Sequence, residues 1–298
     1  MTVQPISTDW IDQAVVDGGG VLVEPADAEA VVWTHKSAPE DLSTLLAAHP
    51  GLRWVQLPWA GVDPYRPLFD RERAWTCAKG VYADPVAEQA LALLLAGYRN
   101  LGAYARATSW GWGEGRNLYG AKVTIVGGGG IGQVLIRLLA PFGCEITVVR
   151  RRARPMDGVA RVLPATDLHD ALHGADALVL ALPLVDDTDG LIGAEELALL
   201  ASGAWVINVA RGEHLATDAL LAALESGHLG GAGLDVTDPE PLPDGHPLWG
   251  RPDVIITPHT ANTPEMAKPL LGRRIRENVA HWAAGEPLDG VVDPDLGY

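Results

Sequence analysis

A glycine-rich turn near the middle of the chain constrains the fold more than any other feature. The β-branched run Val123–Val126 leads directly into the pattern GxGxxG, whose glycine places are taken by Gly127, Gly129 and Gly132. An apolar helical pattern, Gln133–Leu139, follows at once. In such a turn the first glycine permits a tight bend, the second lets the backbone approach a pyrophosphate, and the third lets the helix pack closely against the strand. Because strand, turn and helix occur in this order, we predict a dinucleotide-binding site and not merely a flexible glycine loop.

The second half of the chain alternates short apolar runs with helical patterns. The uninterrupted apolar character of most runs is typical of strands buried on both faces, as in a parallel sheet. A helix is expected over Asp218–Glu225, with Thr217 as its N-cap and Gly227 as its stop. Alternation of this kind predicts a doubly wound α/β sheet. The expected strands are Val123–Val126, Ile146–Val149, Ala177–Leu182, Trp205–Val209, Gly231–Val236 and Val254–Thr257.

The first 80 residues predict a smaller α/β unit. Strands are expected at Val31–Thr34 and Trp54–Leu57, with a helix over Asp41–Ala48 between them. A long helix is expected to begin at Asp84 and Pro85, a suitable N-cap and first helical residue, and another to span Pro264–Ala284. We interpret these two helices as the connections between two domains. One domain would comprise residues 1–82 and 264–298, and the other residues 83–263.

The charge balance limits the partners of the chain. Its 298 residues include 22 Lys and Arg against 38 Asp and Glu, a net charge of −16. Such a chain repels nucleic acid and anionic membrane surfaces, and a site for a small acid must carry local positive charge. No apolar run is long enough for a membrane span, no signal peptide is recognisable, and the two cysteines, Cys77 and Cys144, are too few for a disulfide framework. We therefore expect a cytoplasmic protein.

A run of arginines stands where the ribose of a bound dinucleotide would be read. In NAD enzymes this place, at the end of the strand after the glycine turn, usually holds a carboxylate. Here it holds Arg150, Arg151 and Arg152, with Arg154 close behind. Adjacent guanidinium groups suit a 2′-phosphate, which favours NADP(H) over NAD(H). The alternative is a solvated basic turn.

Polar segments follow three of the later predicted strands. In open α/β sheets, ligands bind at the carboxyl ends of the strands, so these segments are expected to share one edge. They supply one arginine, one glutamate and one histidine: Arg211, Glu240 and His259. The segments are Asn208–Gly212, Leu234–Pro241 and Thr257–Ala261.

Together with the glycine turn, these segments closely resemble the D-isomer-specific 2-hydroxyacid dehydrogenase family. The resemblance covers nearly the whole chain and includes Trp59–Asp63, Val86–Glu88, and Leu182 and Pro183 with Thr188. It implies a doubly wound Rossmann-type nucleotide domain inserted into a smaller flavodoxin-like α/β substrate domain. Within the family, the arginine run and the short length are most similar to glyoxylate/hydroxypyruvate reductases.

The resemblance also implies a role for each motif. Arg211 would hold the substrate carboxylate and keto oxygen, His259 would be the general acid, and Glu240 would fix the tautomer of His259. Asp235 would accept a hydrogen bond from the nicotinamide amide. The substrate loop would be Trp59, Ala60 and Gly61. The implied cofactor residues are Gly127, Gly129, Gly130, Ile131, Gly132, Arg150, Arg151, Arg152, Leu182, Pro183, Thr188, Ala210, Asp235 and Ala261.

The expected function is NAD(P)H-dependent reduction of a small 2-keto acid, such as glyoxylate or hydroxypyruvate, without a metal. One alternative is a dehydrogenase that runs in the oxidative direction, for example on phosphoglycerate. Another is a nicotinamide-sensing binding protein of the same fold, because function depends on the site and not on the fold. The resemblance implies a homodimer, and the aromatic arm at Trp110 and Trp112 could form a dimer contact or pack on its own subunit.

Overall fold

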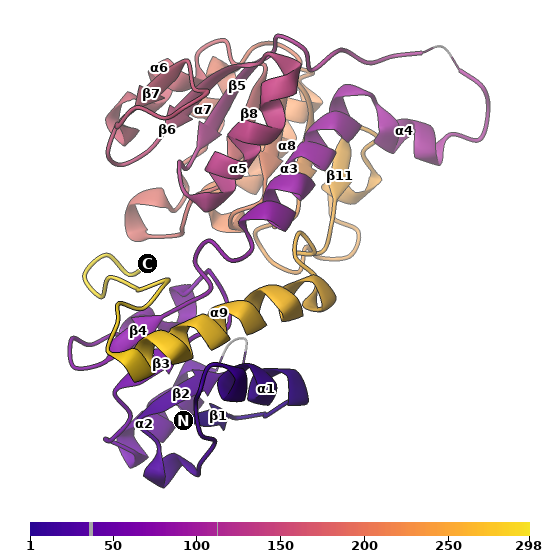
Figure 1. The fold of residues 1–298 in the computed structure, drawn as a ribbon. Coiled ribbons are helices and arrows are strands. Elements are labelled where there is room, and N and C mark those ends of the chain that lie inside the picture. The colour runs from indigo at the N-terminus through magenta and orange to yellow at the C-terminus, as the bar shows by residue number, and fades with distance from the viewer. Residues whose placement is uncertain (36–37, 112) are drawn as a thin grey trace. The chain divides into compact units, whose positions relative to one another are not determined.

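The computed structural model describes residues 1–35, 38–111 and 113–298, so Trp112 of the aromatic arm lies outside the described residues. The chain divides into two compact units (Figure 1). The first unit is made from both ends of the chain, Met1–Tyr82 and Thr263–Tyr298, and the second is the continuous segment Ala83–Asn262. Both are α/β units with parallel sheets.

In its described residues, the second unit contains a seven-stranded parallel sheet in the order β11-β10-β9-β8-β5-β6-β7. The order reverses between β5 and β8, which is the switch point of a doubly wound Rossmann-type fold. The strands are β5 (Lys122–Val126), β6 (Glu145–Val149), β7 (Arg161–Leu163), β8 (Ala177–Leu180), β9 (Ala204–Asn208), β10 (Leu229–Leu234) and β11 (Val254–Ile256).

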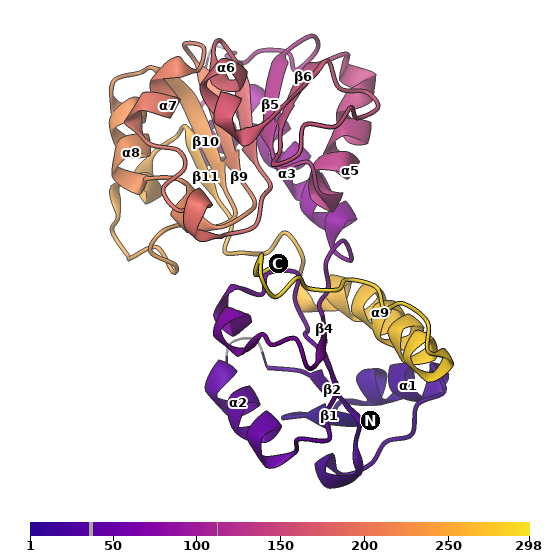
Figure 2. The ribbon, with the colours of Figure 1, turned by 90° about the vertical axis from the view of Figure 1, so that its left-hand side faces the viewer.

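Helices cover both faces of this sheet (Figure 2). One hydrophobic core joins α3 and α5 to one face, and the other joins α6, α7 and α8 to the opposite face. A central strand such as β9 is buried throughout, which explains its uninterrupted apolar sequence. The helices are α3 (Ala83–Tyr98), α4 (Leu101–Arg106), α5 (Gly130–Leu139), α6 (Leu168–Leu172), α7 (Ala194–Leu199) and α8 (Thr217–Glu225).

All six strands predicted for this unit are present, with corrected bounds. The β10 strand begins at Leu229 and includes Gly231, where a Cβ would lie 2.4 Å from the Trp205 ring, so a glycine is needed for the close approach. The β7 strand was not predicted, because it is a three-residue edge strand that begins with the exposed Arg161.

Two helix starts also differ from the prediction. The N-cap of α8 is Ala216, not Thr217, because the Thr217 hydroxyl donates instead to the carbonyl oxygen of Asp238 at 2.6 Å. Helix α3 begins at Ala83, one residue before Asp84. Pro85 therefore lies in the first turn, where its missing N–H is not needed for the helix.

The first unit has a four-stranded parallel sheet, order β1-β2-β3-β4, among its described residues. Residues 21–23 flank β1, since the Val23 amide donates to the Met1 carbonyl and the Met1 amino group donates to the Val21 carbonyl. Backbone carbonyls alternate in direction along a strand. Because the Gln4 carbonyl accepts from the Thr34 amide just after β2, the Met1 carbonyl, three residues earlier, is directed to the opposite side of β1. Residues 21–23 come second in the sequence, after β1, but lie at the edge of the sheet outside β1. The order across the sheet is therefore residues 21–23, β1, β2, β3, β4, which is the 2-1-3-4-5 order of flavodoxin-like folds. The elements are β1 (Thr2–Gln4), β2 (Ala30–Trp33), β3 (Trp54–Gln56), β4 (Ala74–Thr76), α1 (Asp9–Asp17), α2 (Pro39–Ala48) and α9 (Pro264–Ala284).

The end of the chain is tied to this sheet by buried polar side chains. The Asn278 amide on α9 donates to the Gln56 side-chain oxygen at 2.9 Å, and the Thr76 hydroxyl donates to the same oxygen at 2.9 Å. Beyond α9, Val291 forms an antiparallel bridge with Thr76. Since Gln56, Thr76 and Asn278 are fully buried, these hydrogen bonds fix the helix to the sheet without water.

Candidate functional site

The glycine turn joins β5 to α5 with little room for side chains. Gly127 has φ +118°, and a Cβ there would lie 2.0 Å from the carbonyl oxygen of Ala181. A Cβ on Gly132 would lie 2.2 Å from the carbonyl oxygen of Gly127. The first and third glycines are therefore required by the backbone itself, because any larger residue would displace the turn from the sheet.

Gly129, the middle glycine, differs from the other two. It is the N-cap of α5, with φ −83° and ψ −161°, and a Cβ there would meet no atom within 4 Å. The first amides of α5 lack partners within the helix, and they carry its positive dipole end. They belong to Gly130, Ile131 and Gly132. Open space beside helical amides is the geometry that binds a phosphate.

The arginine run follows β6. The Arg150 amide donates to the carbonyl oxygen of Leu163 at 3.0 Å, which fixes its backbone to β7. Its side chain lies against the glycine turn, since a Cβ on Gly128 would be 3.1 Å from Arg150 Cδ. Arg151 and Arg152 are exposed. The structure thus brings one guanidinium side chain to the turn and leaves the next two at the surface.

Arg211 follows β9 on a tightly held turn. The buried Asn208 fixes that turn, because its side-chain amide donates to the Arg211 carbonyl at 2.8 Å and its side-chain oxygen accepts from the Ala210 amide at 3.0 Å. A Cβ on Gly212 would lie 2.0 Å from the Thr237 carbonyl oxygen. The half-buried Arg211 side chain donates to the Ala210 carbonyl at 2.7 Å. The role of Asn208 was not foreseen, although the residue lies in the predicted motif.

His259 and Glu240 form a direct pair. Nδ1 of His259 lies 2.8 Å from Oε1 of Glu240, and their side chains are 38% and 42% exposed. The His259 backbone has φ +52°, a left-handed conformation that is uncommon for a residue other than glycine. Its amide donates to the carbonyls of Asp235 and Thr257 at 2.8 and 2.9 Å, which hold the strained conformation in place. With Nδ1 directed at the carboxylate, Nε2 is the ring nitrogen left for a substrate.

Asp235 organises the segment that carries His259. Its buried carboxylate accepts from the Thr257 hydroxyl at 2.6 Å, and from the amides of Thr260 and Ala261 at 2.9 and 3.1 Å. On α3, the Gln89 side chain donates to the same Thr257 hydroxyl at 3.1 Å. The expectation for Asp235 named only a nicotinamide contact, so this set of loop contacts was not foreseen.

The segment after β8 is closed on itself by Thr188. The Thr188 hydroxyl accepts from the Val185 amide at 2.9 Å, and its single proton can be donated to the carbonyl of Pro183 or of Val185, which both lie 3.0 Å away. His214 contacts the same segment from the polar turn after Arg211. Nothing in the sequence pattern singled out His214, although its place three residues after Arg211 was a usable signal.

The candidate residues of the second unit share one edge of the sheet. All its strands are parallel, so the segments that follow them meet at the carboxyl edge. Among the described residues, no group of three or more His, Cys, Asp or Glu side chains could hold a metal ion. The candidates are Gly127–Gly132 after β5, Arg150–Arg152 after β6, Leu182, Pro183 and Thr188 after β8, Ala210 and Arg211 after β9, Asp235 and Glu240 after β10, and His259 and Ala261 after β11.

The expected substrate loop, Trp59–Gly61, belongs to the first unit and follows β3. The Ala78 amide donates to the Trp59 carbonyl at 3.0 Å, and the Trp59 and Tyr82 rings lie 6.0 Å apart. The Trp59 indole N–H is buried without a hydrogen-bond partner among the described residues. Nearby, burial raises the pKa of the Cys77 thiol, whose Sγ is 3.9 Å from the Ala60 carbonyl oxygen.

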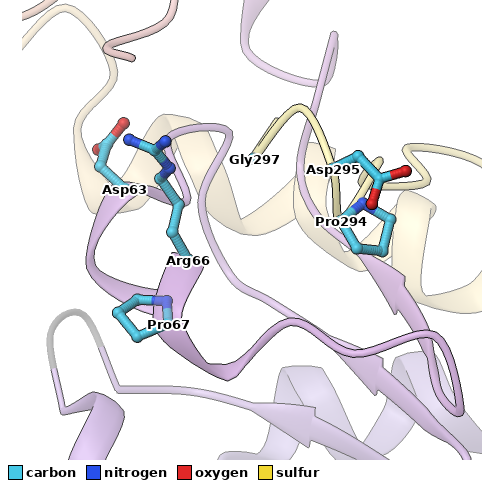
Figure 3. A pocket seen from close by; sticks show the side chains of 6 residues that line it. All are labelled: Asp63, Arg66, Pro67, Pro294, Asp295 and Gly297. Atoms are coloured by element: carbon cyan, nitrogen blue, oxygen red, sulfur yellow. The ribbon is translucent and has the colours of Figure 1, made fainter. Parts of the chain in front are cut away.

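A cavity of about 420 Å³ lies beside this loop in the first unit (Figure 3). Its wall combines the turn after the loop with the end of the chain. The Arg66 side chain packs on Gly297, where a Cβ would lie 2.6 Å from Arg66 Nε. None of the predicted site residues lines the cavity. The lining residues are Asp63, Arg66, Pro67, Pro294, Asp295 and Gly297.

In the described residues, no helix has the length and apolar character required to cross a lipid bilayer.

Comparison with known proteins identifies relatives over the whole chain. Glyoxylate/hydroxypyruvate reductase A from Serratia proteamaculans is 34% identical over 290 residues, which cover 92% of this chain and 88% of the relative. A D-isomer specific 2-hydroxyacid dehydrogenase from Xanthobacter autotrophicus, solved in complex with NADPH and MES, is 30% identical with a TM-score of 0.87, covering 100% of this chain and 99% of that one.

A second relative of known structure also aligns with the full length of this chain. The NADPH-dependent glyoxylate/hydroxypyruvate reductase from Sinorhizobium meliloti, in complex with NADP and sulfate, is 28% identical with a TM-score of 0.81, covering 100% of this chain and 99% of that one. Residues 91–261 match the model of the D-isomer specific 2-hydroxyacid dehydrogenase NAD binding domain. The chain therefore belongs to the D-isomer specific 2-hydroxyacid dehydrogenases, a family of nicotinamide-dependent oxidoreductases.

Proposed function

We propose that this protein reduces a small 2-keto acid, of the size of glyoxylate or hydroxypyruvate, to the 2-hydroxy acid with NADPH. The observation that carries the proposal is the 2.8 Å pair of His259 and Glu240 at the carboxyl edge of the sheet that also holds the glycine turn. The reductases from Serratia proteamaculans and Sinorhizobium meliloti support the substrate class.

The residues around the glycine turn fit a nicotinamide dinucleotide. Gly129 has open space where a Cβ would stand, and the first amides of α5 would bind the pyrophosphate there. When bound, the coenzyme supplies the hydride for the keto carbon. We further propose that Leu182, Pro183, Ala210 and the segment ending at Ala261 line the nicotinamide side of the site. The carboxylate of Asp235 would serve mainly by fixing that last segment and secondarily by accepting from the nicotinamide amide.

Arg211 would bind the carboxylate and orient the keto group. Its guanidinium is planar and permanently charged, so it can grip a carboxylate through two parallel hydrogen bonds. The turn that carries it is fixed by the side chain of the buried Asn208, which limits the positions that Arg211 can take. In an acidic protein, this local positive charge is what makes an anionic substrate acceptable. Trp59, Ala60 and Gly61 would complete the carboxylate site, an assignment that rests on the family pattern.

His259 would deliver the proton to the keto oxygen. Its Nδ1 is directed at Glu240, so Nε2 carries the proton that is transferred. The carboxylate of Glu240 fixes the ring orientation and stabilises the imidazolium before transfer. The negative charge that develops on the keto oxygen is thus met by a proton at His259 and by the cation of Arg211.

The preference for NADP(H) is supported by the arginine run and by the relatives that were solved with NADPH or NADP. Arg150 lies closest to the glycine turn and would be the main contact of the 2′-phosphate, with Arg151 and Arg152 adding charge. The expected homodimer and a cytoplasmic location are also part of the proposal. Trp110, which follows α4, is fully exposed, and aromatic side chains are enriched at the cores of protein interfaces, which supports a contact with a partner subunit.

The first experiment follows the oxidation of NADPH or NADH by absorbance while glyoxylate, hydroxypyruvate, pyruvate and phenylpyruvate are offered in turn. We expect turnover with NADPH well ahead of NADH, and loss of that preference in Arg150→Ala. A preference for NADH in the wild-type protein would refute the assignment of Arg150–Arg152 to a 2′-phosphate, but it would still support the reductase activity.

Two variants test the chemistry. Arg211→Lys keeps the charge but loses the two-point grip, so kcat/KM should fall by at least about tenfold while NADPH affinity stays unchanged. His259→Ala should lose turnover by about a hundredfold or more and still bind NADPH. If wild-type protein binds NADPH but turns over none of the keto acids, the proposal fails in favour of a nicotinamide-sensing protein.

A further inference from the structure

His214 makes hydrogen bonds that the proposed chemistry does not use. The imidazole is fully buried, on the short helical turn Gly212–His214 that follows Arg211. Nδ1 lies 2.8 Å from the carbonyl oxygen of Thr188, and Nε2 lies 3.2 Å from the carbonyl oxygen of Leu182. Each ring nitrogen thus faces a backbone carbonyl oxygen, and these two oxygens belong to different residues.

These two carbonyls lie at the two ends of one loop. The loop runs from Leu182 to Thr188 and is closed internally by the Thr188 hydroxyl. His214 therefore holds a small closed loop at both of its ends from a single buried side chain. The loop begins two residues after β8, at the carboxyl edge of the sheet, beside the switch point between β5 and β8.

Among the described residues, no backbone–backbone hydrogen bond joins Leu182–Thr188 itself to another segment, although the Ala181 amide just before the loop donates to the Val126 carbonyl at 2.9 Å. The Gly190 amide donates to the Glu213 carbonyl, and the Ile192 amide donates to the His214 carbonyl, so the chain beyond the loop is tied to the turn after Arg211. Those contacts begin only at residue 190. The imidazole adds contacts within the loop itself, at Leu182 and at Thr188.

We propose that His214 is a positioning residue for the coenzyme, which acts by holding the loop Leu182–Thr188 at the nicotinamide side of the site. The inference rests on the proposed function, since it assigns that loop to the coenzyme.

The test compares three substitutions of His214. His214→Phe fills the space but donates to neither carbonyl. His214→Asn places an amide donor near the Nδ1 position, and His214→Gln places one near the Nε2 position. The control is His228→Phe, because the His228 ring contacts the Leu197 carbonyl at 3.1 Å and the residue lies before β10, at the opposite edge of the sheet.

Each protein is titrated with NADPH by fluorescence, and KM for the best keto acid is measured at saturating NADPH. We expect NADPH to bind about tenfold or more weakly to His214→Phe. The keto-acid KM should stay within about twofold of wild type. The amide variants should recover part of the lost affinity, and the control should bind NADPH as the wild-type protein does.

The outcomes separate the two proposals. If the wild-type protein does not bind NADPH, the proposed function fails and this inference fails with it. If the wild-type protein binds NADPH and His214→Phe binds it equally well, only the inference is overturned. It is also overturned if His214→Phe raises the Kd for NADPH and the keto-acid KM by the same factor and no amide variant restores either, because that result describes general loosening of the fold.

Discussion

Alanine substitutions in the glycine turn should separate folding from coenzyme binding. A Cβ at Gly129 would meet nothing within 4 Å, and its φ of −83° is open to any residue. Gly129→Ala should therefore leave the free energy of unfolding within about 1 kcal/mol of wild type, or raise it slightly by restricting the unfolded chain. A Cβ at Gly132 would lie 2.2 Å from the Gly127 carbonyl oxygen, so Gly132→Ala must displace the turn.

The expected magnitudes follow from these distances. Overpacking of the kind at Gly132 costs about 1–3 kcal/mol, and each kcal/mol lowers Tm by about 2–4 °C in a domain of this size. The methyl group of Gly129→Ala would instead occupy the space that we propose for the pyrophosphate. Loss of one hydrogen bond to a charged group costs about 1.5–3 kcal/mol, which weakens NADPH binding by about tenfold to a hundredfold.

The assay is thermal unfolding of each variant with and without NADPH. Gly129→Ala should have the wild-type Tm in the absence of coenzyme and a strongly reduced Tm increase in its presence, whereas Gly132→Ala should start from a lower Tm. Gly250→Ala is the control, because its Cβ would also meet no atom within 4 Å and the residue is far from the turn in the sequence. Wild-type NADPH affinity in Gly129→Ala would refute the assignment of this turn to the pyrophosphate.

Three further predictions concern other parts of the molecule. Asn208→Ala releases the turn that carries Arg211, so it should lower kcat/KM by about tenfold or more and destabilise the protein by about 1–3 kcal/mol, measured by steady-state kinetics and urea unfolding. Burial alone would raise the pKa of Glu196, but hydrogen bonds from His169 and from a backbone amide outweigh it and lower the pKa below its ordinary value. That carboxylate therefore stabilises the fold above its unfolded-state pKa and loses this effect as the pH falls through its folded-state pKa, so Glu196→Gln should show a smaller loss of Tm than wild type between about pH 6 and pH 3. The Cys77 thiol is buried and its pKa is raised, so it should react with a thiol reagent only after unfolding, and rapid reaction in the native protein would contradict that description.

Much of the fold was predictable because its signals are local. The apolar runs of β5, β6, β8, β9 and β10 are almost entirely buried, and burial on both faces is what the uninterrupted pattern indicates. The β1 and β7 strands were not predicted; β7 begins with the exposed Arg161 and its other two residues are only partly buried, so it carries little of this pattern.

The placement of the candidate site residues was predictable where they lie in motifs that directly follow strands. Arg211, Glu240 and His259 follow successive strands, and the parallel sheet brings their segments to one edge. The residues that hold those segments were harder to find. Asn208 and His214 act through contacts with backbone carbonyls and amides, and no sequence pattern encodes which carbonyl a buried side chain will meet. The positive φ of His259 likewise depends on amide partners supplied by other segments.

The division of the chain also sets an order of events during synthesis. The second unit is continuous in sequence, so all its strands are available once Asn262 has left the ribosome. The first unit cannot be completed then, because the Gln56 side-chain oxygen accepts from Asn278, and Thr76 forms its bridge with Val291, only when those two residues have emerged. Its contacts have high sequence separation and form late. The N-terminal segment therefore lacks these contacts of Gln56 and Thr76 until the C-terminal part of the chain has been synthesised and has packed against its sheet.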